Sequence, residues 1–421
     1  MGTYHLEWTT GARGLLVLAI MLLAGSAVAQ DRPVLMDIEP DNSAQAQAVL
    51  DFWTPERMRR AIPKPFPAVP TTGAEVPTNA EAELPPEAYP GFAQGWRPGR
   101  GPQPDSESRI DITPNHPLYE SLVGAEQPQT SPPFSPPGNP TDFGNYAPFN
   151  RFTWHAGAYL VYPISAVGKL FFTQRGQNFV CSASVIHRST LATAGHCVHD
   201  GSNNAAGWST NVLFCPSLNP GGSPRGCWAG VTLATSAQWF GSANIDRDYG
   251  CIVTSTTGST INNRVGNVTG WSGRAWNWPS RQATFAWGYP AAAPFPGNRI
   301  ITAASTEWYQ LNRNASESQL SKYIGNDMTG GSSGGPWWIN MVYSNVEYAD
   351  TDGSNLTDPF QGNTAPLING VNSHKRCNQT GCPAGSIFTQ EMGSPQFRNT
   401  AADNNESEDV FGVCFSNGGT L

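Results

Sequence analysis

The chain has 421 residues, which is enough to bury at least one large hydrophobic core, and its formal net charge at pH 7 is −8. Residues 1–150 hold 9 Lys+Arg and 17 Asp+Glu, whereas residues 151–421 hold 15 of each, so the acidic excess lies entirely in the first part. Nothing in this distribution indicates the basic patch that a nucleic-acid-binding protein would need.

The first predicted element is a signal peptide over residues 1–29. Leu15–Ala24 is an unbroken apolar run, preceded by Arg13 and followed by Ala27-Val28-Ala29, which predicts cleavage after Ala29. A membrane anchor is the alternative, but the run is short for a helix that spans a bilayer. We therefore expect a secreted protein, extracellular or periplasmic, without stable membrane insertion.

Residues 30–150 are acidic and rich in proline, because 23 of the 36 prolines of the chain lie in residues 1–150. Stretches such as Pro63–Pro67 favour extended backbone, and only Ala44–Val49 followed by Phe52–Arg60 has helical character. A largely irregular segment between a signal peptide and a folded domain is typical of a propeptide. The alternative is a disordered acidic spacer. If the segment is a propeptide, we expect its removal near residues 140–155, with Arg151 as one possible cleavage point.

Residues 151–421 contain short runs rich in Val, Ile, Phe, Trp and Tyr, separated by Gly, Asn, Pro and Ser. Helical periodicity is nearly absent, which predicts an all-β domain, either a barrel or a sandwich. The 14 tryptophans occur at mixed positions and are expected to pack in the core.

A histidine in this domain has the context of a catalytic base. His196 lies in Thr193-Ala194-Gly195-His196-Cys197, and Cys181 lies sixteen residues before Cys197. A Cys181–Cys197 disulfide would fix the loop that carries the histidine, which suits a group that must be placed accurately. The other six histidines lie in no comparable context.

A carboxylate is expected to orient this imidazole, and the segment Ile245–Val253 offers two. Asp248 leads directly into an apolar strand-like run, so it is better placed to be buried against His196. Asp246 lies next to Arg247 and is expected to be a solvated loop charge. We therefore assign Asp248 as the orienting acid, because that role requires sequestration from water.

The candidate nucleophile lies in the turn-like stretch Gly330-Gly331-Ser332-Ser333-Gly334-Gly335-Pro336-Trp337. Glycine allows backbone conformations that are closed to other residues, so N–H groups can converge there on a carbonyl oxygen that becomes negatively charged. A plain Gly/Ser turn is the alternative, and partner residues such as His196 and Asp248 argue against it.

The order His196, Asp248, Ser333, with Thr-Ala-Gly-His-Cys, Asp-Tyr-Gly and Gly-Ser-Ser-Gly-Gly-Pro around them, resembles the chymotrypsin-like serine peptidases. Within that group it is similar to the secreted V8-like, or glutamyl-endopeptidase-like, branch. Three further stretches share the resemblance, 167–172, 179–186 and 287–291. The resemblance covers about residues 150–421 and implies a trypsin-like peptidase domain over 151–421, with two six-stranded antiparallel barrels and the catalytic triad in the cleft between them.

The same resemblance implies a role for each motif residue. Ser333 would be the nucleophile, His196 the general base and acid, and Asp248 its orienting partner. The backbone N–H groups of Gly331 and Ser333 would form the oxyanion hole. Ser332 departs from the family's frequent aspartate before the nucleophile, which argues against activation by pairing of that aspartate with a new N-terminus.

The eight cysteines all lie in residues 181–414, and an even number in a secreted chain favours disulfides over free thiols. Besides Cys181–Cys197 we expect three further pairs: Cys215–Cys227, Cys377–Cys382 and, by elimination, Cys251–Cys414. Zinc is the competing use of cysteine, but no CxxC pair has a matching second half. We expect no metal and no other cofactor.

Two residues bear on substrate choice. Asp327 lies six residues before Ser333, where trypsin-like relatives carry the acid that binds Lys or Arg, and a carboxylate there would favour a cationic side chain. Alternatively, Asp327 is structural and caps its own turn. Asn372 stands where the V8-like branch carries the histidine used for glutamyl specificity, and His374 could replace that histidine only if the loop were shifted by two residues.

The sequence thus predicts a secreted serine endopeptidase that cleaves protein or peptide substrates through an acyl-enzyme. We expect the enzyme to be a monomer and its own propeptide to be a binding partner. A catalytically silent secreted binding module on the same fold is the alternative, since a fold does not determine activity. An esterase of the α/β-hydrolase type is disfavoured because its triad runs Ser, Asp, His.

Overall fold

Short β-strands dominate the fold, as the sequence predicts. The structure is a computed structural model. It describes residues 32–37, 43–70, 76–78, 88–98, 109–116, 119, 149–279, 282–312, 321–339, 366–377, 390–400 and 406–418. The predicted signal peptide lies outside these residues. None of the helices in the described ranges is long and apolar enough to cross a membrane.

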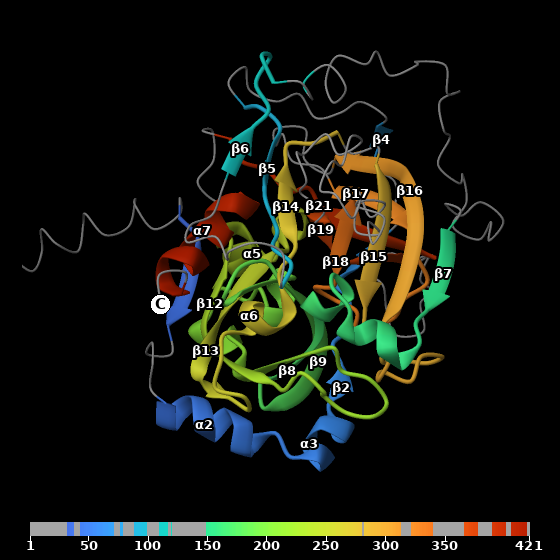
Figure 1. The fold of residues 1–421 in the computed structure, drawn as a ribbon. Helices are drawn as coiled ribbons and strands as arrows, with labels where there is room; N and C mark the ends of the chain where they lie inside the picture. Colours follow the sequence, from blue (N-terminus) through green and yellow to red (C-terminus); the bar gives the residue numbers. More distant parts are fainter. Residues whose placement is uncertain are drawn as a thin grey trace, which may run out of the picture.

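The first sheet closes into a six-stranded antiparallel barrel in the order β12-β11-β8-β9-β10-β13, with β13 pairing back onto β12. Its strands are β8 (Val167–Gln174), β9 (Gln177–Val185), β10 (Thr190–Thr193), β11 (Thr210–Pro216), β12 (Trp228–Thr235) and β13 (Gly250–Ser259). The tight turn between β8 and β9 is Arg175-Gly176, and both residues have positive φ, which matches the twist of a hairpin. Figure 1 shows this barrel in green and yellow.

The second sheet follows the order β21-β17-β16-β15-β18-β19-β14 and is drawn mainly in orange and red in Figure 1. Its strands are β14 (Gly273–Trp276), β15 (Ala283–Gly288), β16 (Ile301–Asn312), β17 (Ser321–Gly325), β18 (Pro336–Ile339), β19 (Leu367–Val371) and β21 (Glu391–Pro395). The family resemblance implies a second six-stranded barrel. Among the described strands this sheet has no closing pair, and it includes a parallel contact between β14 and β19.

Parts of residues 30–150 form short elements, and most of their strands join one of the two sheets. They are β1 (Val34–Asp37), α2 (Ser43–Phe52), α3 (Pro55–Arg60), β2 (Ile62–Pro63), β3 (Ala68–Pro70), β4 (Val76–Thr78), β5 (Gly91–Ala93) and β6 (Arg109–Asp111). β1 and β2 pair with β12 and β9 of the first barrel, whereas β4 and β5 pair with β16 and β14 of the second sheet. Strand β7 (Phe149–Thr153), which contains Arg151, also pairs with β16.

The expected helical character of residues 44–60 is confirmed by α2 and α3, which lie against the first barrel in Figure 1. Thr54 caps α3 by accepting the N–H of Arg57 at 3.2 Å, and Pro55 begins the helix, where its missing N–H costs no hydrogen bond. Between the two helices, Trp53 is 4% exposed and donates its indole N–H to the carbonyl of Asn211. This tryptophan anchors the segment to the barrel.

The remaining helices are short, apart from α7 near the C-terminal end. They are α4 (Gly195–Val198), α5 (Ala237–Ser242), α6 (Val265–Thr269) and α7 (Ser407–Gly418), with 3-10 turns η2 (Ala156–Leu160), η3 (Ile164–Ala166), η4 (Ala205–Gly207) and η5 (Ile245–Arg247). Six tryptophans are among the fully buried side chains, which confirms their expected place in the core: Trp228, Trp271, Trp276, Trp287, Trp337 and Trp338. Trp287 and Trp338 of the second sheet belong to the same hydrophobic cluster as the first barrel.

Three disulfides are present in the described residues, and all three are pairs expected from the sequence: Cys181–Cys197, Cys215–Cys227 and Cys251–Cys414. The third joins β13 to α7 across 163 residues of sequence. Cys377, at the end of β20 (Lys375–Cys377), is also disulfide-bonded. Its expected partner Cys382 lies outside the described residues.

Candidate active site

The strand ends of the two sheets bring the three predicted triad residues into one region. His196 lies in α4, directly after β10, and Asp248 follows η5, directly before β13. Strands β10 and β13 are paired, with Thr193 opposite Gly250, so the residues beyond these ends are neighbours. Ser333 lies in the turn between β17 and β18 of the second sheet.

The carboxylate of Asp248 holds His196 at two points. Oδ2 lies 2.8 Å from Nδ1 of the imidazole, and Oδ1 accepts the backbone N–H of His196 at 2.7 Å. Asp248 is fully buried and His196 is 2% exposed. A buried acceptor on Nδ1 favours the tautomer whose proton is on Nδ1, which leaves Nε2 able to accept a proton.

The neighbouring acid Asp246 does not have the environment expected from the sequence. It was expected to be a solvated loop charge, but it is 3% exposed and accepts a hydrogen bond from the hydroxyl of Ser321. The expectation is wrong because η5 turns this side chain toward β17 of the second sheet. Asp246 therefore links the two halves of the fold, whereas Asp248 faces His196.

A serine that the sequence analysis did not single out completes the surroundings of Asp248. Ser373 donates its hydroxyl to Asp248 Oδ2 at 2.6 Å, and the hydroxyl oxygen of Ser373 lies 2.8 Å from Nδ1 of His374. Nε2 of His374 in turn lies 2.8 Å from the hydroxyl of Tyr323. The sequence gives only a weak signal for a role of Ser373, because Asn-Ser-His simply follows a buried strand. Only the fold shows that this strand of the second sheet ends at Asp248.

The turn around Ser333 is shaped by glycines with left-handed backbone. Gly331 has φ +94° and Gly334 has φ +80°. A Cβ on Gly334 would lie 2.0 Å from the hydroxyl oxygen of Thr193, so only glycine fits against the first barrel there. The carbonyl of Ser333 accepts the N–H of Ser182 at 2.7 Å, which ties the turn to β9.

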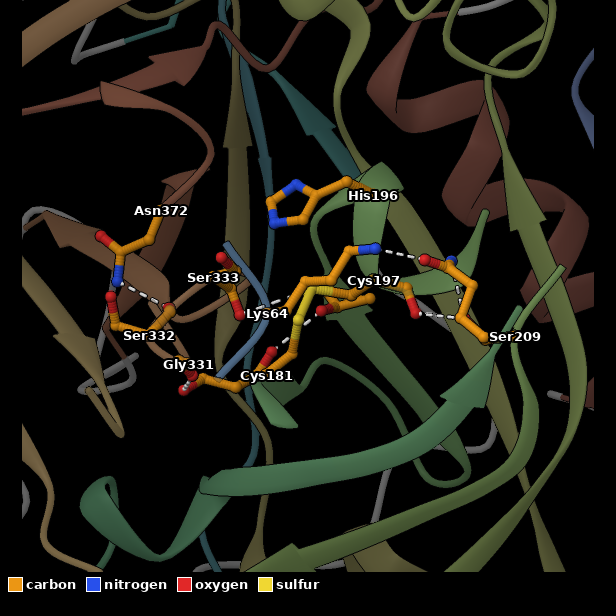
Figure 2. The surroundings of a disulfide bond; sticks show 12 residues. Lys64, Cys181, His196, Cys197, Ser209, Gly331, Ser332, Ser333 and Asn372 are labelled. Atoms are coloured by element: carbon orange, nitrogen blue, oxygen red, sulfur yellow. Dashed lines mark hydrogen bonds between the residues drawn. A yellow bond between two sulfur atoms is a disulfide. The ribbon is translucent and has the colours of Figure 1, made fainter. Parts of the chain in front are cut away.

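The two adjacent serines have different surroundings. Ser332 donates its hydroxyl to the carbonyl of Thr329 at 2.9 Å and so belongs to the turn itself. The hydroxyl oxygen of Ser333 and Nε2 of His196 are both buried and have no hydrogen-bond partner in the described part of the chain. Figure 2 shows His196 and Ser333 above the Cys181–Cys197 disulfide. The reactive atoms are uncommitted but are shielded from solvent.

The two predicted substrate-binding residues are engaged with protein groups. Asp327 accepts a hydrogen bond from the guanidinium of Arg151 at 2.5 Å. The alternative prediction was that Asp327 caps its own turn. In the structure Asn326 makes such a contact, since its side-chain oxygen accepts the N–H of Met328 at 2.8 Å. Close to Asp327, burial lowers the pKa of Lys375 to about 8, and the charges of Asp327 and Glu391 oppose this shift.

Asn372 is fully buried and its amide is used inside the fold. Its oxygen accepts the indole N–H of Trp337 at 2.8 Å, and its NH₂ group donates to the carbonyls of Trp287 at 2.7 Å and Ser332 at 3.0 Å. Both donors of the amide are therefore taken. His374, which could have replaced the family's specificity histidine after a loop shift, is itself fully buried between Ser373 and Tyr323.

One cluster of metal-ligating residue types occurs in the described ranges. Cys181, His196 and Cys197 place their ligand atoms within 4.8 Å of one another. Both sulfur atoms belong to one disulfide, so neither is a thiolate, and thiolate is the form that binds metal. This donor set does not suit a metal ion.

No known family profile matches the chain. It is 26% identical over 156 residues to a glutamyl endopeptidase of Bacillus licheniformis, covering 37% of this chain and 44% of that protein. It is also 26% identical over 102 residues to an extracellular metalloprotease of Bacillus subtilis, covering 24% of this chain and 29% of that protein. The chain thus spans less than half the length of either curated relative.

Among solved structures, the chain is similar to the thermostable serine protease AL20 from an extremophilic microorganism, with 32% sequence identity and a TM-score of 0.43. The similarity covers 56% of this chain and 92% of that protease. The three motifs, in the order His196, Asp248, Ser333, thus occur in a chain that is similar in sequence to serine peptidases and, among its curated relatives, to a glutamyl endopeptidase.

Proposed function

We propose that the chain is the precursor of a secreted serine endopeptidase whose triad is His196, Asp248 and Ser333. Ser333 Oγ attacks the carbonyl carbon of a peptide bond while Nε2 of His196 takes the hydroxyl proton. His196 then gives this proton to the leaving nitrogen, so the C–N bond breaks and an ester on Ser333 remains. Water repeats the sequence on the ester and releases the acid and the free serine.

The observation that carries this proposal is the double contact between Asp248 and His196. A fully buried carboxylate at 2.8 Å from Nδ1 and 2.7 Å from the backbone N–H of the same residue fixes both the position and the tautomer of the ring. It also stabilises the imidazolium that forms while the proton is on His196. A binding module that lacks catalysis has no need of this arrangement beside an uncommitted serine.

The oxyanion that forms on the substrate carbonyl oxygen is assigned to the N–H groups of Gly331 and Ser333. The positive φ of Gly331 supports this assignment, because it sets the orientation of the adjoining peptide groups at the edge of the cleft. Each such donor contributes on the order of 10²–10³ in rate in serine peptidases.

We further propose that residues 1–29 direct secretion, that residues 30–150 are removed as a propeptide and that the mature domain begins near residue 151. The partners are then protein or peptide substrates and the propeptide itself, and the active form is a monomer. Peptidase relatives of this kind, one of them described as extracellular, support secretion and peptide substrates.

The similarity to a metalloprotease does not support metal-dependent proteolysis as a second candidate function. The sulfur atoms next to His196 are held in a disulfide and cannot serve as metal ligands. The serine route needs none of these sulfur atoms, since all of its proton transfers run through Nε2 of His196.

Adjacent serines provide a matched test of the nucleophile. Ser333→Ala should abolish both peptide hydrolysis and covalent labelling by a fluorophosphonate, whereas Ser332→Ala should lose only its turn hydrogen bond, at a cost of about 1 kcal/mol in the free energy of unfolding. Labelling during prolonged incubation is measured by intact-mass spectrometry. Persistent labelling of Ser333→Ala would refute the assignment of the nucleophile.

A further inference from the structure

A short part of the predicted propeptide runs directly over the candidate active site. Strand β2 pairs in parallel with β9, placing Ile62 opposite Phe179 and Pro63 opposite Val180. The N–H of Lys64 continues this pairing by donating to the carbonyl of Val180 at 3.0 Å. Because Cys181 follows Val180, the pairing brings the chain to the disulfide that holds His196.

The carbonyl of Lys64 lies at the predicted oxyanion hole. The N–H of Gly331 donates to it at 3.3 Å, and a Cβ on the neighbouring Gly330 would lie 2.8 Å from the same oxygen. Gly331 is one of the two residues whose N–H groups are assigned to stabilise the substrate oxyanion. A backbone carbonyl of the chain itself therefore accepts from one of the two N–H groups assigned to the substrate oxyanion.

The side chain of Lys64 is also held by the first barrel. Its ammonium donates to Gln174 Oε1 and lies 4.7 Å from the centre of the Phe179 ring. Gln174 is 2% exposed, so this partner is a buried part of the first barrel. Burial lowers the pKa of Lys64, and the charges of Asp200 and Asp248 oppose that shift. Figure 2 shows Lys64 among Gly331, Ser333 and His196.

Beyond Lys64 the segment leaves the first barrel and reaches β20, with which β3 forms a separate two-stranded sheet. The carbonyl of Pro67 accepts the N–H of Lys375 at 3.2 Å, and β3 then pairs in parallel with β20, with Ala68 opposite Lys375. The segment thus makes main-chain hydrogen bonds to the first barrel at Val180, to the Ser333 turn at Gly331 and to β20 at Lys375. Adding a strand to existing strands in this way is a common mode of peptide binding.

We propose that residues 61–70, the plug segment, are a built-in inhibitor that occupies the peptide-binding cleft of the proposed peptidase, with the carbonyl of Lys64 at the oxyanion hole. This inference rests on the proposed function. It accounts for the burial of Ser333 and His196, whose reactive atoms have no partner among the described residues and yet do not reach solvent.

The amino-acid sequence of the plug segment suits this role. Prolines at 63, 65 and 67 fix φ near the extended range, so the segment loses little conformational entropy when it lies in the cleft. Proline has no N–H, and of the two residues in 63–67 that have one, Lys64 directs it to Val180. Stiff extended backbone with few unpaired donors is what a tight competitive inhibitor requires.

The test compares two charge reversals within the predicted propeptide of the full chain. Lys64→Glu places a carboxylate beside Gln174 Oε1 and near Asp248, whereas Arg59→Glu makes the same charge change on an exposed side of α3. Intact unprocessed protein is incubated with a fluorophosphonate, and the labelling rate of the full-length species is followed by mass spectrometry. Lys64→Ala, which removes the side-chain contacts without adding repulsion, serves as a milder second variant, and circular dichroism checks the fold of each protein.

We expect full-length Lys64→Glu to label roughly tenfold faster than the parent chain or more, Lys64→Ala to lie between them, and Arg59→Glu to match the parent. Equal labelling rates in all four folded proteins, with labelling lost in Ser333→Ala, would overturn the plug and leave the proposed activity intact. If no folded variant takes up the probe, the assignment of Ser333 fails and the inference falls with it.

Discussion

Replacing Asp248 by asparagine is the sharpest test of the proposed triad, because it changes one acceptor atom and almost no volume. In the structure Oδ1 accepts the backbone N–H of His196 and Oδ2 contacts both Nδ1 of His196 and the hydroxyl of Ser373. An asparagine has one oxygen, which best retains the backbone N–H. Its NH₂ group then faces Nδ1, which must give up its proton to accept the new donor.

The consequence is a change of tautomer. The ring proton moves to Nε2, so His196 can no longer take the proton of Ser333, and the imidazolium loses its buried counter-charge. The same exchange in a serine-peptidase triad costs on the order of 10⁴ in kcat, which corresponds to about 5.5 kcal/mol of transition-state stabilisation. The neutral side chain avoids burying a charge, so we expect the melting temperature of Asp248→Asn to stay close to that of the parent.

The assay measures peptide hydrolysis and fluorophosphonate labelling of parent and variant in the same full-chain background, so that any block by the plug segment cancels in the ratio. Asp246→Asn is the matched control: its oxygen can still accept from Ser321, and its rate should stay within about threefold of the parent. If Asp248→Asn keeps more than a tenth of the parent rate while His196→Ala is inactive, Asp248 does not orient the base and the reasoning is refuted.

Three further outcomes follow from named contacts. Ser373→Ala removes one hydrogen bond to the carboxylate of Asp248 and should lower the rate of hydrolysis roughly tenfold, measured as kcat on a peptide substrate. Burial raises the pKa of Glu406 from 4.5 to about 7. Between these two pH values the carboxyl group is deprotonated in the unfolded chain but still protonated in the folded chain. The free energy of unfolding should therefore fall by up to about 3 kcal/mol as pH rises through this window and then level off. Thermal melts at pH 5 and pH 8 should show this decline for the parent and a smaller one for Glu406→Gln. Replacing both Cys251 and Cys414 by alanine opens a loop of 163 residues and should cost up to about 5 kcal/mol of stability in urea unfolding, whereas no loss would show that α7 is held without the bond.

Much of the candidate site could be predicted from the sequence because its chemistry is local. Each triad residue has a neighbour in the sequence that indicates its role. These neighbours are the glycines around Ser333, Cys197 next to His196 and the apolar strand that follows Asp248. The resemblance to the chymotrypsin-like serine peptidases then supplies the order of the motifs. The helices of residues 43–60 were also foreseeable, since Thr54 and Pro55 mark a helix start in any context.

What could not be predicted depends on residues distant in sequence. Ser373 looks like any polar residue after a strand, and only the packing of β19 against the first barrel places its hydroxyl on Asp248. From the sequence Asp246 is expected to be a solvated loop charge, but the 3-10 turn η5 directs its carboxylate to the hydroxyl of Ser321. Asp327 and Asn372 match specificity positions, yet Arg151 and Trp337 from other strands already engage them.

The sequence by itself predicted the all-β fold class, the candidate triad and three cysteine pairs that the structure contains. The triad motifs and two of these pairs follow from residue types and short spacings, and Cys251–Cys414 follows by elimination. Only the tertiary structure decided that a proline-rich stretch more than a hundred residues before His196 lies over Ser333. Proline stiffness shows that such a stretch is extended but not what it contacts, since its partners Val180, Gly331 and Lys375 come from three separate parts of the chain.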